Sequence, residues 1–251
     1  MSALMVERMG QGSDLALIHG WGIGKSAWQT VLPLLTQRFR VHLVELPGYG
    51  SFPDKAPVAD FMETAAALAD SLPAGCTLCG WSLGGLLAMQ AACFEPRRVG
   101  RLILCGSTPS FIQRADWPHA QPPALLNSFS EAVADNAAGA LQRFSALLNQ
   151  GDVRARANVR TLARALTANP LPDSATLLRG LHWLGSVDLR AQIAAITLPT
   201  LIIHGENDPL MPLAAAHWLN ENLPHAQLKI FNSAAHAPFL NDPEQFVQLF
   251  I

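Results

Sequence analysis

Short apolar runs recur along the chain and are separated by longer segments whose apolar residues recur every three or four positions. Brief apolar runs bounded by Gly, Pro or Asn are typical of buried strands, whereas the longer period is typical of helices. We predict strands at 14–20, 40–46, 76–82, 99–107, 197–205 and, with the loop after it, 227–236. We predict helices at 26–38, 58–72, 83–96, 211–223 and 243–251. This alternation favours an α/β fold with a mainly parallel sheet covered by helices on both faces.

The pattern changes between residues 111 and 195, where no convincing strand occurs. Helical periodicity is present near 123–137, 138–149, 153–168 and 174–184. Segments that contain Pro or Gly, such as "WPHAQPP" and "ANPLPD", interrupt it. We therefore predict a helical cap at 111–195, inserted into a core formed by 1–110 and 196–251. We expect the cap to lie over the edge of the sheet where ligands bind.

The composition narrows the class of protein. Half of the 251 residues are hydrophobic and only 14% are charged, so the chain can bury a sizeable core. No apolar run reaches about 18 residues, and the N-terminus lacks a basic region followed by an apolar one, which favours a cytoplasmic protein. The net charge of −2 predicts no general attraction to nucleic acid or membrane. Nothing demands more than a monomer.

The four cysteines do not indicate a redox or metal site. Cys76 and Cys79 form a C-x-x-C, but they lie in a predicted strand, where residues three apart point to opposite faces. We interpret all four as small buried apolar residues. No two histidines have the spacing of a zinc site, so we expect no metal and no cofactor.

The candidate chemistry begins at "GWSLG", residues 80–84, between a predicted strand and a predicted helix. G-x-S-x-G at that junction is typical of a sharp turn that exposes the serine at its tip, with glycines where the chain passes close to itself and to the next strand. The amides of the following helix favour developing negative charge at Ser82. Ser82 is thus a candidate nucleophile rather than a plain helix cap.

A serine nucleophile needs a base and a carboxylate that orients the base. In this architecture the chain order is serine, acid, histidine. Asp208 follows the predicted strand 197–205 and precedes a Pro-containing turn, and we prefer it to Glu206. His236 lies in the loop after the next strand. Ser82, Asp208 and His236 are therefore the predicted triad.

The motif "HGWG" begins at His19 and follows the first predicted strand. We predict that the backbone N–H groups of Trp21 and Leu83 form an oxyanion hole. We interpret His19 as a structural hydrogen-bonding residue, and we expect the side chains of Trp21 and Trp81 to line the acyl pocket.

The stretches "HGWG", "LPGYG", "GWSLGG" and "AAHAPF" together resemble the α/β-hydrolase superfamily with a helical cap. Over nearly the whole chain, "LIHGWG", "GWSLGGL", "ADWP" and "AAHAPF" resemble more narrowly the esterases of biotin synthesis that demethylate pimeloyl-acyl carrier protein methyl ester. The resemblance implies a serine carboxylesterase that needs no cofactor. One departure is Glu45, where relatives usually have Asp.

The cap carries eight arginines and six acidic residues, whereas the rest of the chain has an excess of acids. Arg156, Arg160 and Arg164 recur at i, i+4 and i+8 with no acid between them, so their repulsion favours an anionic partner. The resemblance implies that an acidic acyl carrier protein contacts Arg143, Arg156 and Arg160, although Gly139 replaces a basic residue of relatives. It also implies an acyl channel along Phe144, Ala146 and Leu147. The expected substrate-binding residues are Trp21, Trp81, Ser82, Leu83, Phe144, Ala146, Leu147 and His236.

Three other functions fit parts of the same pattern. A broad short-chain carboxylesterase and a carbon–carbon bond hydrolase of ring-cleavage products would use the same triad and cap. A non-catalytic ligand receptor with this fold would not need an intact triad. Dehalogenases and epoxide hydrolases are disfavoured, because they need an aspartate where this chain has Ser82.

Overall fold

The computed structural model describes residues 4–50, 60–167 and 170–251. Its centre is a seven-stranded sheet in the order β1-β3-β2-β4-β5-β6-β7. Among the strands of the described residues, only β1 runs antiparallel to its neighbour and all other adjacent pairs are parallel, which confirms the predicted mainly parallel sheet. The strands are β1 Met5–Met9, β2 Ser13–Ile18, β3 Phe39–Glu45, β4 Cys76–Trp81, β5 Val99–Cys105, β6 Thr200–Gly205 and β7 Ala226–Phe231.

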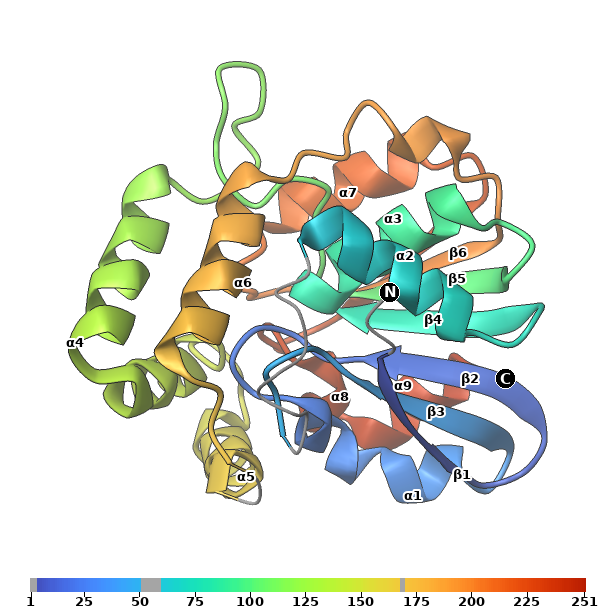
Figure 1. Ribbon diagram of the computed structural model, residues 1–251, viewed down its shortest axis with the longest axis horizontal. Helices are drawn as coiled ribbons and strands as arrows, with labels where there is room; N and C mark the ends of the chain where they lie inside the picture. Colours follow the sequence, from blue (N-terminus) through green and yellow to red (C-terminus); the bar gives the residue numbers. More distant parts are fainter. Residues whose placement is uncertain (1–3, 51–59, 168–169) are drawn as a thin grey trace.

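Helices cover both faces of this sheet (Figure 1). In that view α2, α3 and α7 lie above the sheet, and α1, α8 and α9 lie below it. The core helices are η1 Lys25–Thr30, α1 Leu32–Leu35, α2 Phe61–Ser71, α3 Leu83–Phe94, α7 Leu213–Asn222, α8 Pro238–Asn241 and α9 Pro243–Gln248. The element order and the two covered faces are those of an α/β hydrolase fold.

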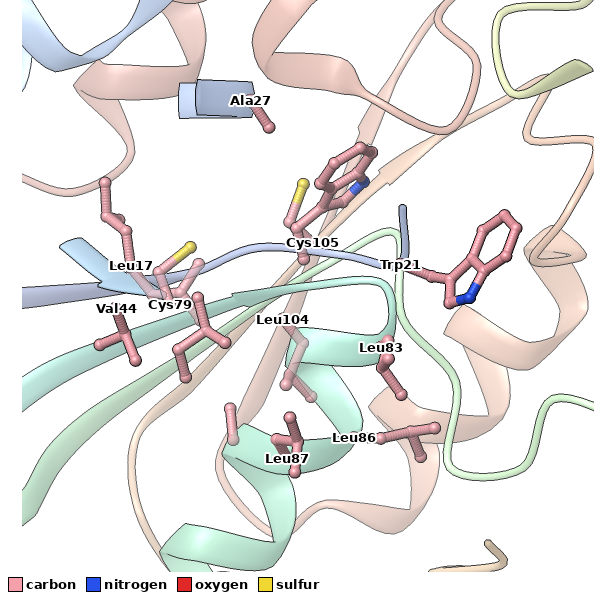
Figure 2. Close-up of a cluster of buried hydrophobic side chains, with 14 of the residues drawn as sticks. Leu17, Trp21, Ala27, Val44, Cys79, Leu83, Leu86, Leu87, Leu104 and Cys105 are labelled. Carbon is pink, nitrogen blue, oxygen red and sulfur yellow. The ribbon is translucent and has the colours of Figure 1, made fainter. Parts of the chain in front are cut away.

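The main hydrophobic core lies between the sheet and these helices. Leu104 of β5 and Leu86 and Leu87 of α3 are fully buried together on one face of the sheet, whereas the fully buried Leu17 of β2 lies on the other face (Figure 2). Each such side chain contributes about 1.5–3 kcal/mol through burial. This packing fixes α3 on the sheet and thereby holds the β4–α3 turn rigidly.

Three longer helices between β5 and β6 lie beyond one end of the sheet, at the left of Figure 1. They are α4 Pro123–Leu147, α5 Ala155–Thr167 and α6 Ser174–Ser186, and the short η2 Ile193–Ala195 follows them. Helix α4 is interrupted at Asn136, whose φ of −154° is not helical and whose side chain accepts a hydrogen bond from the Gly139 N–H at 2.9 Å. The predicted break between 137 and 138 therefore lies within two residues of the observed one.

Several sequence predictions need correction. Strand β1 was not expected, and the helix predicted at 26–38 is a 3-10 helix followed by the single turn α1. Helix α2 begins at Phe61 after an Asp60 capping box. Positions 58 and 59 of the helix predicted there, and position 168 of the helix predicted at 153–168, lie outside the described residues. Among the residues that the structure describes, no helix has the length and apolar character to cross a membrane.

Candidate active site

Ser82 lies at the turn between β4 and α3 with φ 57° and ψ −119°, a conformation that a non-glycine residue rarely adopts. A Cβ atom on Gly80 would lie 2.7 Å from Gly85 Cα, and one on Gly84 would lie 2.6 Å from the carbonyl oxygen of Ile18 in the adjacent strand. Neither position has room for a side chain. The prediction that these glycines permit close approach is confirmed.

Asp208 and His236 meet beyond the carboxyl ends of β6 and β7. His236 Nδ1 lies 2.8 Å from Asp208 Oδ2, and both side chains are fully buried. Glu206 is exposed and instead accepts a hydrogen bond from the Ser233 N–H at 3.0 Å. Of the two carboxylates considered, it is therefore Asp208 that can orient His236.

The surroundings of Asp208 favour its ionised form. Burial alone would raise the pKa of Asp208, but the nearby imidazoles of His236 and His204 and the Met211 N–H together lower it below its ordinary value. The N–H groups of Leu210 and Met211 donate to Oδ1 at 2.8 and 2.9 Å. An ionised Asp208 accepts the Nδ1–H of His236, which leaves Nε2 as the proton acceptor.

His236 Nε2 is buried and has no hydrogen-bond partner within the described parts of the chain. A buried imidazole nitrogen without a partner is costly unless a substrate or a reacting group engages it. The backbone of His236 is fixed from two sides, because its carbonyl accepts the Trp81 Nε1–H at 2.9 Å and its N–H donates to Leu148 O at 3.1 Å.

The loop after β2 lies directly against the serine. A Cβ atom on Gly20 would lie 3.1 Å from Ser82 Cβ, so the loop passes next to Ser82 at Gly20, one residue before Trp21. His19 Nδ1 lies 2.8 Å from Gly20 O, and its Nε2 lies 3.1 Å from the Leu46 backbone nitrogen, which confirms that His19 is a structural hydrogen-bonding residue. Oxyanion binding by the Trp21 and Leu83 amides stays a prediction.

Glu45 contacts the same loop at His19 and Lys25. Its carboxylate lies 3.2 Å from His19 Nε2 and accepts the Lys25 N–H at 2.9 Å. Burial alone would raise the pKa of Glu45, but His19 and the Lys25 N–H lower it below its ordinary value. The longer glutamate therefore fits this buried structural position.

The two tryptophans occupy different surroundings. Trp21 packs edge-on against Phe144 with ring centroids 4.8 Å apart, which places Phe144 next to the oxyanion loop. Trp81 packs against Phe239, 5.1 Å away, in the core below the His236 loop. Trp81 also contacts His236, because its Nε1–H donates to the His236 carbonyl and the two rings lie with centroids 5.6 Å apart. Its role in lining an acyl pocket stays a prediction.

Phe144 is buried, Leu147 is half-buried and Ala146 is exposed. A mostly apolar cavity of about 180 Å³ lies between α4 and α5, and neither Ala146 nor Leu147 lines it. The lining residues are Ala138, Leu141, Gln142, Ser145, Val159, Ala163, Leu166, Thr167 and Leu171. The acyl channel along Ala146 and Leu147 therefore stays a prediction.

The cap arginines differ in their surroundings, and the half-buried Arg179 donates to Pro47 O at 3.0 Å. Arg114 and Arg190 form ion pairs with Asp188 at the base of the cap. Arg143, Arg156 and Arg160 are exposed, as are Arg154 and Arg164, and none of these five forms an ion pair with a described residue. Helix α5 buries Leu162 and Leu166 on its inner side and turns its arginines outward.

Cys76, Cys79 and Cys105 are buried and unpaired, and burial raises the pKa of Cys76 to about 12. A thiol with such a pKa is a poor nucleophile at neutral pH. Within the described residues, no three His, Cys, Asp or Glu side chains are grouped so that they could hold a metal ion.

Comparisons with known proteins show the family to which the chain belongs. The sequence profile of the Alpha/beta hydrolase family matches residues 15–249. The pimeloyl-[acyl-carrier protein] methyl ester esterase of Nitrosomonas europaea is 40% identical over 250 residues, which cover 100% of this chain and 99% of the relative. The protein of the same name from Photobacterium profundum is 43% identical over 248 residues, covering 98% of this chain and 96% of the relative.

Among solved structures, an esterase from Exiguobacterium antarcticum superposes with a TM-score of 0.88 at 23% identity, covering 100% of this chain and 98% of that one. An enol-lactonase from Burkholderia xenovorans superposes with a TM-score of 0.84 at 20% identity, covering 98% and 94%. At these identities the two likenesses concern the fold alone.

Proposed function

This chain belongs to the alpha/beta hydrolase family and, within it, to the pimeloyl-[acyl-carrier protein] methyl ester esterases, and we propose that it removes the methyl group from pimeloyl-acyl carrier protein methyl ester in biotin synthesis. The observation that carries the proposal is the buried His236–Asp208 pair, together with a serine in a strained strand–helix turn. The full-length similarity to these esterases supports the choice of substrate.

In the first half of the reaction, His236 Nε2 takes the proton of Ser82 while Oγ attacks the ester carbonyl carbon. The negative charge that develops on the carbonyl oxygen is stabilised by the N–H groups of Trp21 and Leu83. Asp208 stabilises the imidazolium of His236. The tetrahedral intermediate then collapses, the proton passes from His236 to the leaving oxygen, and methanol departs from an acyl-enzyme.

In the second half, a water molecule attacks the acyl carbon and gives its proton to His236 Nε2. The same two amides hold the oxyanion, and the proton returns to Ser82 Oγ when the acyl–serine bond breaks. The products are the free carboxylate and regenerated enzyme. Each step uses only groups of this chain and water.

The cap supplies the recognition of the carrier. Acyl carrier proteins are acidic, and the exposed arginines Arg143, Arg156 and Arg160 have no acidic partner among the described residues. Exposed complementary charges steer association and fix orientation more than they add affinity. The acyl chain then enters along the cap side of the oxyanion loop, where Phe144 packs on Trp21.

The test is incubation of the protein with pimeloyl-acyl carrier protein methyl ester, followed by measurement of methanol and of the free acid on the carrier. We expect both products in equal amounts, and none with Ser82→Ala. Hydrolysis of p-nitrophenyl butyrate without hydrolysis of the carrier ester would contradict the proposed substrate and favour a broad short-chain esterase. Absence of turnover on both would favour a non-catalytic receptor.

A further inference from the structure

The turn that joins α4 to α5, residues 148–154, lies against the loop that carries His236. The His236 N–H donates to Leu148 O at 3.1 Å, and the Val153 N–H donates to Ser233 O at 3.1 Å. The cap therefore makes backbone hydrogen bonds to the catalytic loop at His236 itself and three residues before it. A shift of this turn would shift His236.

Asp152 is the side chain at the centre of this contact. It is 7% exposed, and its Oδ2 accepts the N–H of Ala235, the residue before His236, at 3.0 Å. Oδ1 accepts the Asn241 Nδ2–H at 2.9 Å and the Arg154 N–H at 2.6 Å. One carboxylate thus joins the start of α5, the His236 loop and α8.

The chemistry of this contact calls for a carboxylate. All three partners are donors, and only an ionised carboxylate presents two oxygens that accept without offering a hydrogen. No Lys, Arg or His of the described residues forms an ion pair with Asp152. A buried carboxylate that is held by N–H donors alone makes charge-assisted hydrogen bonds, which restrict the positions of the donor groups.

We propose that Asp152 is a positioning residue for the hydrolytic reaction, which holds Ala235 and thereby sets the imidazole of His236 against Ser82 and Asp208. The inference rests on the proposed role of His236 as the base. It adds a second carboxylate to the site: Asp208 fixes the ring through Nδ1, and Asp152 fixes the backbone that carries the ring. Precise placement of a base matters because a displacement of about 1 Å can cost about a hundredfold in rate.

The test compares Asp152→Asn with the wild type on p-nitrophenyl butyrate and on the carrier ester. The amide of Asn must turn its NH₂ group toward either the Ala235 N–H or the other two donors, so one or two of the three contacts are lost while the side-chain volume is kept. We expect kcat to fall by about 10- to 100-fold with KM changed by less than about threefold. The rate of Ser82 inactivation by phenylmethylsulfonyl fluoride should fall in parallel.

Asp173→Asn is the matched control. Asp173 is also a cap carboxylate that accepts a backbone N–H, that of Thr176 at 2.7 Å, but it caps α6, and Thr176 lies outside the His236 loop. We expect its kcat to stay within about twofold of the wild type. Asp152→Ser is the second variant, and it should also lose kcat, because its single hydroxyl cannot serve three donors.

The outcomes separate this inference from the proposed function. Turnover by the wild type tests the function, whereas the ratio of variant to wild-type kcat on p-nitrophenyl butyrate tests Asp152 whichever natural substrate is correct. An unchanged kcat in Asp152→Asn, with or without a lower free energy of unfolding, overturns the inference. An increase in KM alone would overturn it as well.

Discussion

At the scale of single residues, Ser82 combines two demands that oppose each other. Its φ of 57° places the serine at the tip of the turn, yet the conformation is costly for any residue with a Cβ atom, by about 1–3 kcal/mol. Strain of this kind persists only where the surroundings force it, and here the buried α3 and β4 hold both ends of the turn.

This strain predicts that glycine stabilises the fold more than alanine at position 82, the reverse of the usual order in a helix. Ser82→Gly should unfold with a free energy about 1–2 kcal/mol higher than Ser82→Ala, because only glycine adopts this φ without strain. Both variants should lose esterase activity by a factor on the order of 10⁴ or more. Urea unfolding monitored by circular dichroism measures the difference.

The control for this comparison is Ser128, an exposed residue within α4. There alanine should be more stable than glycine by about 1 kcal/mol, as in ordinary helices. If alanine is also the more stable variant at position 82, the turn is not strained.

The two carboxylates that follow β6 should differ sharply in their effect on rate. Asp208→Asn removes the acceptor that holds Nδ1–H of His236 at 2.8 Å, so kcat should fall by a factor on the order of 10⁴. Glu206→Gln, two residues away, keeps an oxygen for the Ser233 N–H and should keep kcat within about threefold. Steady-state kinetics on p-nitrophenyl butyrate decide the matter, and equal losses would contradict the assignment.

Residues with local signatures could be predicted from the sequence, and those with distant partners could not. Gly80, Ser82 and Gly84 form a five-residue motif, and Asp208 and His236 follow recognisable strands. Asp152 contacts Ala235 across 83 positions of the chain, and nothing near it in the sequence marks that contact. The bond from Trp81 to the His236 carbonyl spans 155 positions and was missed for the same reason.

At the scale of elements, α5 presents its arginines to solvent because its apolar side packs against α4 and η1. Leu162 and Leu166 are buried, so Arg156 and Arg160 lie on the side that faces away from them. Arginines four positions apart repel one another in the free protein. An acidic partner would relieve that repulsion.

Charge reversal on this helix should therefore affect one substrate and spare another. The double variant Arg156→Glu/Arg160→Glu should raise KM for the carrier-bound ester by about tenfold or more, and less so in high salt, because exposed charges act through screened attraction. KM for p-nitrophenyl butyrate should stay within about twofold. Kinetics with both esters at two salt concentrations measure this.

The control is Arg38→Glu, which changes the net charge at an exposed position of the hydrolase core, away from the cap. It should leave KM for both esters nearly unchanged. Equal increases for the two esters in the α5 variant would contradict docking of the carrier on this helix.

Elements with strong periodicity were predicted well, and short or mixed ones were not. The break in α4 could be located because Asn136 and Gly139 interrupt a helical pattern, and the side chain of Asn136 indeed caps the second half. The segment 26–38 also has helical periodicity, but Pro33 can occupy only the first turn of a helix, which leaves a 3-10 turn before it. Strand β1 is half exposed and pairs on one side only, so its signal is weak.

At the scale of the whole molecule, the parallel sheet brings candidate catalytic residues from distant parts of the chain to one edge. Ser82, Asp208 and His236 follow β4, β6 and β7, and the Trp21 loop follows β2. Parallel strands place all four loops at the same end of the sheet, where Leu148 and Phe144 of the segment between β5 and β6 contact His236 and Trp21. The sequence order of strands therefore predicts the meeting place, while the atomic placement depends on the cap contacts.

The buried imidazole of His204 beneath this edge should make the stability of the whole molecule depend on pH. His204 is fully buried and donates from Nε2 to Met211 O at 2.8 Å, and burial lowers its pKa below the ordinary 6.5. The unfolded chain thus binds the proton more readily than the folded one. Stability from this group is complete above about pH 6.5 and is lost as the pH falls below it, by up to about 1.4 kcal/mol per pH unit.

Urea unfolding at pH 7.5, 6.5 and 5.5 measures this loss, and His204→Gln should flatten it because its amide can still donate to Met211 O without titrating. The lowered pKa of Asp208 does not interfere, since its contribution is complete above its ordinary pKa of 3.8 and is lost only at lower pH. His182→Gln, at an exposed position of α6, should keep the wild-type slope. A slope unchanged in His204→Gln would show that His204 does not carry the pH dependence, and that the loss of stability arises elsewhere in the fold.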